Sequence, residues 1–359
     1  MRTDVVVIGG GPAGCSAAIR LVRAGMRVRL YEKARFPRPK LCGGFLSPES
    51  LEDLEDLDVL EELRQSGAMP VRRTVIVSCQ GTHVESELAA QALSSSRSIL
   101  DHLLLEQARR SGVEIIAGED GFQDQSARAF TVIASGRLTQ GPELMRQERL
   151  SPWYAGSKTR YFGLQTFFQG VQGVSDQVEL DLVEGGYVGL LRQQEGVNVC
   201  ALATQETVAR YGPSLDGILT HFMEENPALR DHLQDATRTR DWMTVGPVRL
   251  GIRQLASGPT FYVGDAACVV DPFVGEGVAM GLYTSRLLMK ALEQEPHDPA
   301  EAYNRLWHQA FDPALRWNAV MRALYSVRFF REPALHALQS FPQGINRLTE
   351  LTRYRRIEA

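Results

Sequence analysis

The chain has 359 residues, of which 44% are hydrophobic and 23% charged, and its formal net charge is −4. This length predicts two lobes or one lobe with a large insertion, and the acidic balance argues against nucleic-acid binding. No apolar run approaches the ~20 residues that span a bilayer, and no signal peptide precedes the first strand, so we expect a cytoplasmic protein. The five cysteines and seven histidines are scattered, which predicts no disulfide framework and no metal site.

The N-terminal segment predicts a strand, a glycine turn and a helix in immediate succession. The apolar run 5–8 leads into Gly9-Gly10-Gly11-Pro12-Ala13-Gly14, which has the pattern Gly-x-Gly-x-x-Gly, and a helical stretch over 15–24 follows. In this pattern Gly9 permits the tight turn, Gly11 lets a pyrophosphate approach the backbone, and Gly14 allows close helix–strand packing. The helix N-terminus then faces the phosphates. The segment therefore predicts a dinucleotide site that includes Pro12 and Ala13.

A second strand over 27–31 ends at Glu32, about 20 residues past the glycines, where a carboxylate can accept hydrogen bonds from an adenosine ribose. We expect Lys33 beside the same cofactor. A Pro- and Gly-rich loop over 35–44 follows and contains Lys40-Leu41-Cys42-Gly43-Gly44. Beyond it, the residue patterns predict a helical stretch over 48–67, strands over 73–79 and 83–88, an amphipathic helix over 97–108 and a parallel strand over 112–116.

Residues 155–250 predict mostly strands, at 161–168, 178–183, 186–191 and 197–203, with a helical stretch over 213–238. The chain then returns to a strand that ends in Gly264-Asp265 and a helix over 277–292. This order predicts an α/β fold, in which a Rossmann-like cofactor-binding domain (1–70, 95–140 and 255–300) is interrupted by a β-sheet-rich substrate-binding domain (71–94 and 141–254). C-terminal helices occupy 301–359.

The segment from Gly264 to Gly277 resembles the second FAD fingerprint of flavoproteins with the p-hydroxybenzoate hydroxylase fold. That family includes aromatic and lipid monooxygenases, flavin halogenases and geranylgeranyl reductases. The resemblance implies that Asp265 accepts from a ribityl hydroxyl and that backbone N–H groups from Gly275 to Val278 face the isoalloxazine. Arg97, four residues before Asp101, looks like the family's cofactor-reaching arginine. The remaining FAD contacts that the resemblance implies are Lys40, Cys42, Gly43, Gly264, Pro272, Glu276 and Gly277.

Individual segments of the chain resemble different members of this family. Cys42-Gly43-Gly44 and the segment from Asp271 to Gly277 resemble geranylgeranyl reductases, in which a cysteine lies beside the flavin. The stretches 185–190 and 196–200 resemble a strand pair of members labelled monooxygenases. The halogenase motif Trp-x-Trp-x-Ile-Pro is absent. Ser135 stands where family hydroxylases carry the aspartate of an Asp-Gly motif, so both NAD(P)H and a protein such as ferredoxin stay open as electron donors.

The resemblance implies an FAD-dependent oxidoreductase. We place first a monooxygenase that acts through a flavin C4a-hydroperoxide on an aromatic, lipid-like or carrier-bound substrate. The alternatives are reduction of isoprenoid C=C bonds and modification of a protein substrate during maturation. Cys42 is the candidate catalytic residue, either by shaping the site or by delivering a proton itself or through a water that it orients, although a free cysteine is often only a small buried side chain. Tyr187 and Trp242 are candidate substrate-pocket residues, or else core.

The C-terminal segment is rich in arginine. Residues 316–359 contain eight arginines and three glutamates, interleaved with apolar residues that include Trp317, Phe329 and Phe330. An amphipathic helix pair of this kind fits peripheral contact with a membrane that delivers a lipid substrate. The other interpretation, which we prefer, is a terminal helical cap whose apolar face packs on the second lobe.

Overall fold

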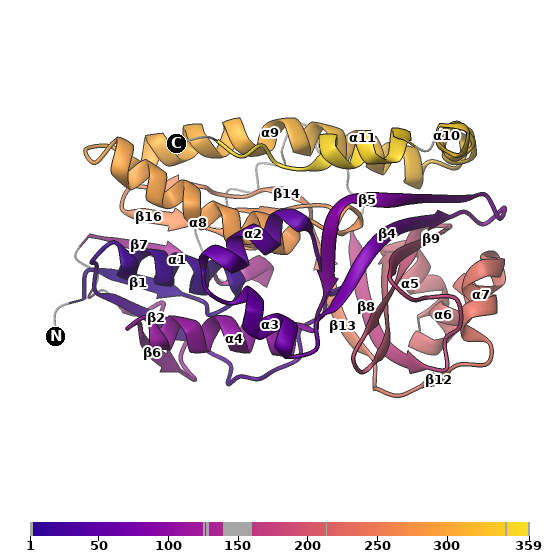
Figure 1. Ribbon diagram of the computed structural model, residues 1–359, viewed down its shortest axis with the longest axis horizontal. Coiled ribbons are helices and arrows are strands. Elements are labelled where there is room, and N and C mark those ends of the chain that lie inside the picture. The colour runs from indigo at the N-terminus through magenta and orange to yellow at the C-terminus, as the bar shows by residue number, and fades with distance from the viewer. Residues whose placement is uncertain are drawn as a thin grey trace.

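The computed structural model describes residues 3–124, 126, 129–138, 160–212, 214–341 and 343–357. Two lobes lie side by side, and a layer of C-terminal helices runs along both of them (Figure 1). The predicted α/β class is confirmed. Residues 141–159, which we expected in the substrate-binding domain, lie outside the described residues.

The cofactor lobe is built on a largely parallel sheet with the strand order β15-β16-β7-β1-β2-β6. Parallel strands of this kind are buried on both faces, which explains the fully buried Val-Val-Val-Ile run of β1. Strand β16 pairs with β7 although more than a hundred residues separate them, so this lobe is discontinuous in sequence. Its strands are β1 (Val5–Ile8), β2 (Val28–Glu32), β6 (Glu114–Ala117), β7 (Phe130–Ile133), β15 (Ala256–Ser257) and β16 (Thr260–Tyr262).

Helices cover this sheet and make the turns of the lobe. The main ones are α1 (Pro12–Arg23), α4 (Arg97–Arg110) and α8 (Gly277–Gln294). The stretch 48–67, expected as continuous, is divided into α2 (Pro48–Asp56) and α3 (Leu60–Gln65). The break falls at Asp58, whose φ of 58° lies in the left-handed region and cannot continue a helix. The short strand β14 (Gly251–Ile252) pairs with β17 (Cys268–Val269), which brings the end of the substrate segment onto this lobe.

The second lobe is a large mixed sheet with the strand order β12-β8-β11-β10-β9-β4-β5-β3, and β13 also pairs with β8. Its faces differ, because Val188 of β10 packs toward helices while Tyr187, Gly189 and Leu191 line a cavity. Its strands are β3 (Phe45–Leu46), β4 (Met69–Val77), β5 (His83–Ser94), β8 (Tyr161–Gln169), β9 (Gln177–Val183), β10 (Gly186–Gln193), β11 (Gly196–Thr204), β12 (Thr237–Arg238) and β13 (Met243–Val248).

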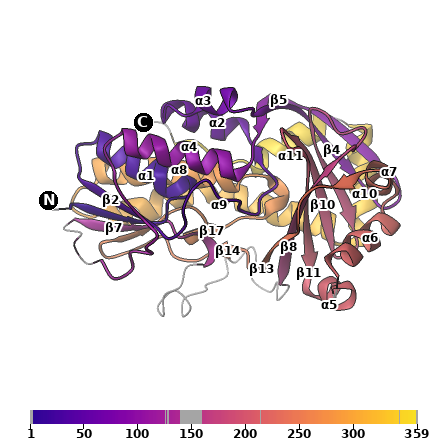
Figure 2. The same cartoon turned by 90° about the horizontal axis from the view of Figure 1, so that it is seen from below.

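Figure 2 shows this sheet between the cofactor lobe and the helices α5 (Gln205–Tyr211), α6 (Leu215–Glu225) and α7 (Pro227–Leu233). The stretch 213–238 was expected to be helical throughout. Instead, Asn226 ends α6 and caps α7, since its side chain accepts from the N–H groups of Ala228 and Leu229. Thr237 and Arg238 form β12 on the edge of the sheet, where they pair with β8.

The C-terminal segment forms α9 (Pro299–Ser326), α10 (Arg328–Ser340) and α11 (Gln343–Thr352). Helix α9 contacts α8 and buries Tyr303, Trp307 and Phe311, while α10 and α11 contact β5 of the second lobe. The inner face of this helical layer therefore packs as a terminal cap does, and it rests on both lobes. No described helix combines the length and the hydrophobicity that crossing a membrane requires.

Candidate functional site

A cavity of about 310 Å³ lies between the two lobes and reaches the C-terminal helices. It gathers residues that are far apart in sequence. The predicted site residues that line it are Gly11, Pro12, Ala13, Lys40, Cys42, Gly43, Arg97, Tyr187, Gly264, Asp265, Pro272, Gly275, Gly277 and Val278.

The glycine turn between β1 and α1 is too tight for side chains at two positions. Gly9 has a φ of 109°, and a Cβ there would lie 2.4 Å from the carbonyl oxygen of Ala134. A Cβ on Gly14 would lie 1.8 Å from the carbonyl oxygen of Gly9. Neither residue lines the cavity, so their part is to shape the turn that brings Gly11 to the cavity wall.

Glu32 is buried at the end of β2 and holds this turn in place. Its carboxylate accepts from the N–H of Gly10 at 2.7 Å and from the N–H of Ala34 at 2.8 Å. An ionised carboxylate has about four acceptor positions, so these bonds leave room for the expected ribose hydroxyls. Lys33, the next residue, is exposed and does not line the cavity. Successive side chains at the end of a strand point to opposite sides, and Glu32 takes the inward one.

Two cations line the cavity beside the glycine turn. The guanidinium of Arg97 donates to both carboxylate oxygens of the buried Asp101, at 2.6 and 2.8 Å, and a Cβ on Gly11 would lie 3.9 Å from its Nη2. Repulsion by Arg97, together with burial, lowers the pKa of the Lys40 ammonium to about 8, against the attraction of Asp265 and Asp101. A phosphate group bound here would relieve that repulsion.

The second motif reaches the cavity through a turn and a helix N-terminus. Gly275 has a φ of 69°, and a Cβ there would lie 2.9 Å from the Cδ1 atom of Phe45. Helix α8 begins at Gly277, so its free N–H groups open toward the cavity. Asp265 lines the same wall, and within the described part of the chain its carboxylate accepts no hydrogen bond. These donors and this acceptor fit the flavin and ribityl contacts that the sequence implied.

Glu276 is buried beside the cavity, between two residues that line it. Its side chain is 1% exposed and does not itself line the cavity, but it is paired with Arg353 of the C-terminal segment, which does. The carboxylate therefore ties the start of α8 to the C-terminal residues. Its backbone is still part of the turn that precedes Gly277.

The loop that carries Cys42 is clamped by two buried side chains of the substrate sheet. The amide group of Asn198 donates to the carbonyl oxygens of Cys42 and Gly43, at 2.9 and 2.8 Å. Gln165 accepts from the Cys42 N–H at 3.2 Å and donates to the Cys42 carbonyl at 3.0 Å. The N–H of Gly44 donates to Cys42 Sγ at 3.4 Å. The backbone of Cys42 is thus fixed on three sides, with the residue in the cavity wall.

The rest of the cavity wall is largely apolar, although Thr74, Arg137 and Arg353 also line it. It includes Leu41, Ile76, Leu180, Val245, Met321, Leu338, Ile345 and Leu348, which come from the loop, the substrate sheet and the C-terminal helices. Tyr187 also lines it, in edge contact with Phe273 at 5.3 Å between ring centroids. Burial, followed by the charge of Asp271, raises the pKa of the Tyr187 phenol, so this residue is neutral. The wall suits an elongated hydrophobic molecule.

Trp242 does not line this cavity. Its indole N–H donates to Asp216 at 2.8 Å, and its ring packs near the cluster between the sheet and helices α6 and α7. Of the two proposed pocket aromatics, only Tyr187 therefore lies at the site. Alternation explains the difference, since Tyr187 faces the cavity side of β10, whereas Trp242 precedes β13 and turns toward α6.

Several residues of the site were not predicted. Gln165 and Asn198 hold the Cys42 loop, and Arg322 and Tyr325 donate to the Asp271 carboxylate at 2.9 and 2.8 Å. The sequence carried one weak signal, because Gln165 and Asn198 are polar residues within otherwise apolar strands. A buried polar side chain needs partners, which points to a specific contact.

The amino-terminal part of the chain, residues 2–140, matches the family model described as "FAD binding domain". The chain is 28% identical over 330 residues to a menaquinone reductase of Mycolicibacterium smegmatis, covering 80% of this chain and 75% of that protein. It is 24% identical over 381 residues to digeranylgeranylglycerophospholipid reductase 2 of Methanopyrus kandleri, covering 97% and 91% of the two chains.

Among solved structures, the flavin-dependent brominase Bmp2 superposes with a TM-score of 0.81 at 17% identity, covering 99% of this chain and 95% of that one. At this identity the likeness is one of fold alone. With the family match, these comparisons confirm FAD as the cofactor, and the turn, the cations and Asp265 described above fit it.

Proposed function

Because the chain is an FAD-dependent oxidoreductase of the p-hydroxybenzoate hydroxylase fold, we propose that it reduces a carbon–carbon double bond in a lipid-like, isoprenoid substrate. The observation that carries the proposal is the clamped Cys42, which lies in the wall where the cofactor part of the cavity meets its apolar part. Relatives named menaquinone reductase and digeranylgeranylglycerophospholipid reductase support the substrate class.

Reduced FAD, when bound, supplies a hydride at N5. Reduction of a double bond needs a proton as well as this hydride, and Cys42 is the candidate donor among the residues that line the wall. Its sulfur already accepts from the Gly44 N–H, so its own hydrogen is available to another acceptor. The two clamping amides keep the backbone of Cys42 from moving when substrate enters. The thiol then recovers its proton from solvent, and NAD(P)H or a protein donor restores the reduced cofactor.

The apolar wall positions the substrate and excludes water. Side chains such as Ile76, Leu180 and Leu338 offer dispersion contacts to a hydrocarbon chain and no hydrogen bond to a polar one. Cys200, which also lines the cavity, does not compete with Cys42 as an acid, because burial raises the pKa of its thiol to about 12. The Cys42 thiol is therefore the candidate acid that is held in place beside the apolar part of the cavity.

A monooxygenase is the second candidate, and the same wall favours it. Oxygen transfer needs a water-poor cavity, since water would release peroxide from the cofactor unproductively. The cavity described here meets that need as well as it meets the needs of a reductase. The two candidates differ in whether Cys42 matters to the chemistry.

An anaerobic single-turnover experiment separates them. The FAD-loaded protein is reduced with NADPH, or with dithionite if NADPH does not serve, and detergent-dispersed menaquinone is added. We expect the oxidised-flavin absorbance band to return without air and the product to gain two hydrogen atoms in its side chain. Cys42→Ser should slow this step on the order of a hundredfold. The control is Cys200→Ser, another cysteine of the same cavity, which should leave the rate nearly unchanged.

A band that returns only in air, with one oxygen atom added to the product, would replace the reductase by the monooxygenase. Equal rates for Cys42→Ser and the unmodified protein would remove Cys42 as the proton donor while leaving reduction in place.

A further inference from the structure

The exposed large hydrophobic side chains gather on the C-terminal helices. In the described part of the chain, all of them except Phe122 fall within residues 317–341. Three phenylalanines stand out, because Phe329 is 80% exposed, Phe341 73% and Phe330 50%. Single exposed hydrophobic residues are ordinary, but a concentration on one segment marks a surface that meets another apolar body.

Helix α10 carries apolar side chains on both of its sides, although His336, Gln339 and Ser340 are also exposed. Its inner side buries Leu335 and the guanidinium of Arg331, which donates to the Tyr325 carbonyl at 2.8 Å, and Leu338 lines the cavity. Its outer side carries Phe330, Ala337 and, just beyond its last residue, Phe341, at a spacing that places them along one stripe. A surface helix ordinarily presents polar residues to water on that side.

The segment that carries these phenylalanines has few acidic side chains. Among the described side chains of residues 316–341, no carboxylate is exposed, since Glu332 is half-buried and accepts from the hydroxyl of Thr82 at 2.8 Å. Arg316 and His336 are exposed there. The whole chain, in contrast, has a net charge of −4. Three arginines that prompted the membrane interpretation, Arg322, Arg331 and Arg353, face inward, so the aromatic residues provide the contact.

The same helices line the cavity, which relates this surface to the site. Leu338 of α10 and Ile345 and Leu348 of α11 belong to the apolar wall. A hydrocarbon chain that leaves a bilayer under α10 would therefore meet apolar side chains on both sides of the helix layer. Figure 1 shows α10 and α11 at the end of that layer, next to the strands β4 and β5 of the substrate sheet.

We propose that Phe329, Phe330 and Phe341 form a docking surface for an anionic lipid bilayer, from which the cavity takes its substrate. The proposal rests on the lipid-like substrate of the proposed function. The three aromatic rings insert at the level of the headgroups, and the absence of exposed carboxylates among the described side chains of residues 316–341 limits repulsion by anionic lipids.

The test uses the FAD-loaded full chain and vesicles of phosphatidylcholine and phosphatidylglycerol in equal parts. We expect the unmodified protein to sediment with the vesicles and the triple variant F329S, F330S and F341S to bind more weakly by about tenfold or more. F122S is the matched control, because it removes an exposed phenylalanine outside the segment and should bind as the unmodified protein does. Thermal unfolding and the flavin spectrum should be the same in all three.

Vesicle binding that is absent in the unmodified protein, or unchanged in the triple variant, would overturn the docking surface. A dimer that becomes a monomer in the triple variant, without vesicle binding, would assign the surface to a second copy of the chain. Reduction of detergent-dispersed menaquinone is measured in parallel and needs no bilayer. In the unmodified protein, reduction without vesicle binding rejects only the docking surface, whereas vesicle binding without reduction rejects only the proposed reaction.

Discussion

At the scale of single residues, the amides of Gln165 and Asn198 decide where Cys42 lies. Both are on neighbouring strands of the substrate sheet, and the Gln165 side chain donates to Asn198 Oδ1 at 3.0 Å, so each amide orients the other. Their remaining groups bond the backbone of the cofactor-side loop. Buried hydrogen-bond networks of this kind specify one arrangement, because every alternative leaves a polar group without a partner.

Replacing Asn198 by Leu should free the Cys42 loop. The carbonyls of Cys42 and Gly43 each lose a donor, which should cost on the order of 1–3 kcal/mol of stability. We expect alkylation of Cys42 by iodoacetamide, followed by peptide mass spectrometry, to become several-fold faster. Thr166→Val is the control, since that hydroxyl donates to the Arg240 carbonyl at 2.7 Å and not to the loop. The same alkylation rate in both variants would show that the amide only fills space.

Lys40 makes cofactor binding depend on pH. Repulsion by Arg97 lowers the pKa of Lys40 from 10.5 to about 8 in the cofactor-free protein, so the ammonium loses its proton as pH rises through 8. FAD carries a negative pyrophosphate and should bind the protonated form better. We expect the Kd for FAD to rise by up to about tenfold between pH 8 and pH 9, measured by flavin fluorescence.

The stability of the cofactor-free protein should rise over the pH range in which its affinity for FAD falls. Between pH 8 and 10.5 the unfolded chain binds more protons at this position than the folded chain does, so the contribution of Lys40 to stability rises with pH. Lys40→Met should remove both dependences. A Kd for FAD that rises equally in that variant would assign the effect to another group.

At the scale of secondary-structure elements, α7 is joined to the back of the substrate sheet by an ion pair. The His232 ring donates from Nε2 to Glu179 at 2.9 Å and from Nδ1 to the Gln172 carbonyl at 2.7 Å. Asp181 lies two residues further along β9 and is buried, and Gln177 also donates to Glu179. The hydrogen bond to Glu179 raises the pKa of His232 to about 9, whereas burial acts against it.

This pair should make stability fall in mildly alkaline solution. The folded pKa lies above the unfolded value of 6.5, so the contribution is complete below pH 6.5 and is lost as pH rises through about 9. His232→Gln should lower the free energy of unfolding on the order of 1–2 kcal/mol at pH 6 and by less at pH 9.5, measured by urea titration. A cost that is the same at both pH values would show that the imidazole is not protonated in the fold.

The sequence predicted elements well where the signal was local. The glycine turn, the flanking strands and the four strands from β8 to β11 follow from periodicity and turn residues within short windows. Two helical stretches were drawn as continuous, because the left-handed φ of Asp58 and the capping bonds of Asn226 depend on three-dimensional context. The hydrogen bonds that hold Cys42 could not be predicted for a related reason, since Gln165 and Asn198 lie 123 and 156 residues away from it in sequence. The residue patterns of β8 and β11 do not indicate which loop these strands bind.

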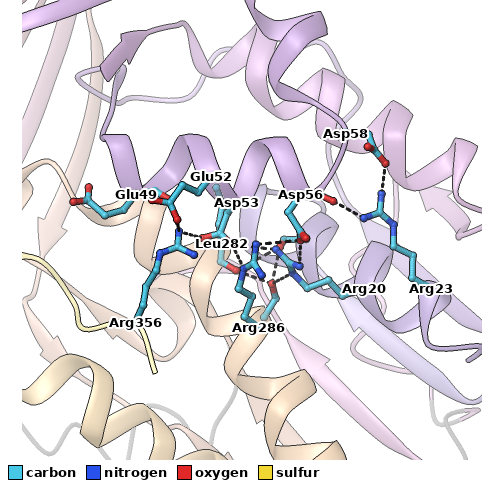
Figure 3. A network of polar contacts seen from close by, with 12 residues as sticks. Arg20, Arg23, Glu49, Glu52, Asp53, Asp56, Asp58, Leu282, Arg286 and Arg356 are labelled. Carbon is cyan, nitrogen blue, oxygen red and sulfur yellow. Dashed lines mark hydrogen bonds and ion pairs between the residues drawn. The ribbon is translucent and has the colours of Figure 1, made fainter. Parts of the chain in front are cut away.

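At the scale of the whole molecule, one carboxylate joins segments from the beginning, the end and the middle of the cofactor lobe. Asp53 on α2 is fully buried and accepts from Arg20 of α1 at 3.1 Å, from Arg286 of α8, and from Arg356 of the C-terminal residues at 3.4 Å (Figure 3). Asp56 shares two of these arginines. The network explains how the C-terminal layer stays on the lobe that binds FAD, although the chain passes through the second lobe before reaching it.

Asp53→Asn should therefore destabilise the protein as a whole. The amide keeps the shape of the side chain but leaves three guanidinium groups sharing Asp56 and the surface acids, and breaking a buried ion pair in this way costs about 3–5 kcal/mol. Asp58→Asn is the matched control in the same region, because the pair of Asp58 with Arg23 at 2.6 Å is exposed and such pairs contribute at most about 1 kcal/mol. Both variants remove one negative charge, so their net charge is equal. Urea unfolding followed by flavin release should show a single earlier transition for Asp53→Asn and almost no change for Asp58→Asn. If the two variants unfold alike, the arginines are held by their other partners, and the C-terminal layer is attached mainly by the apolar face of α9 on α8.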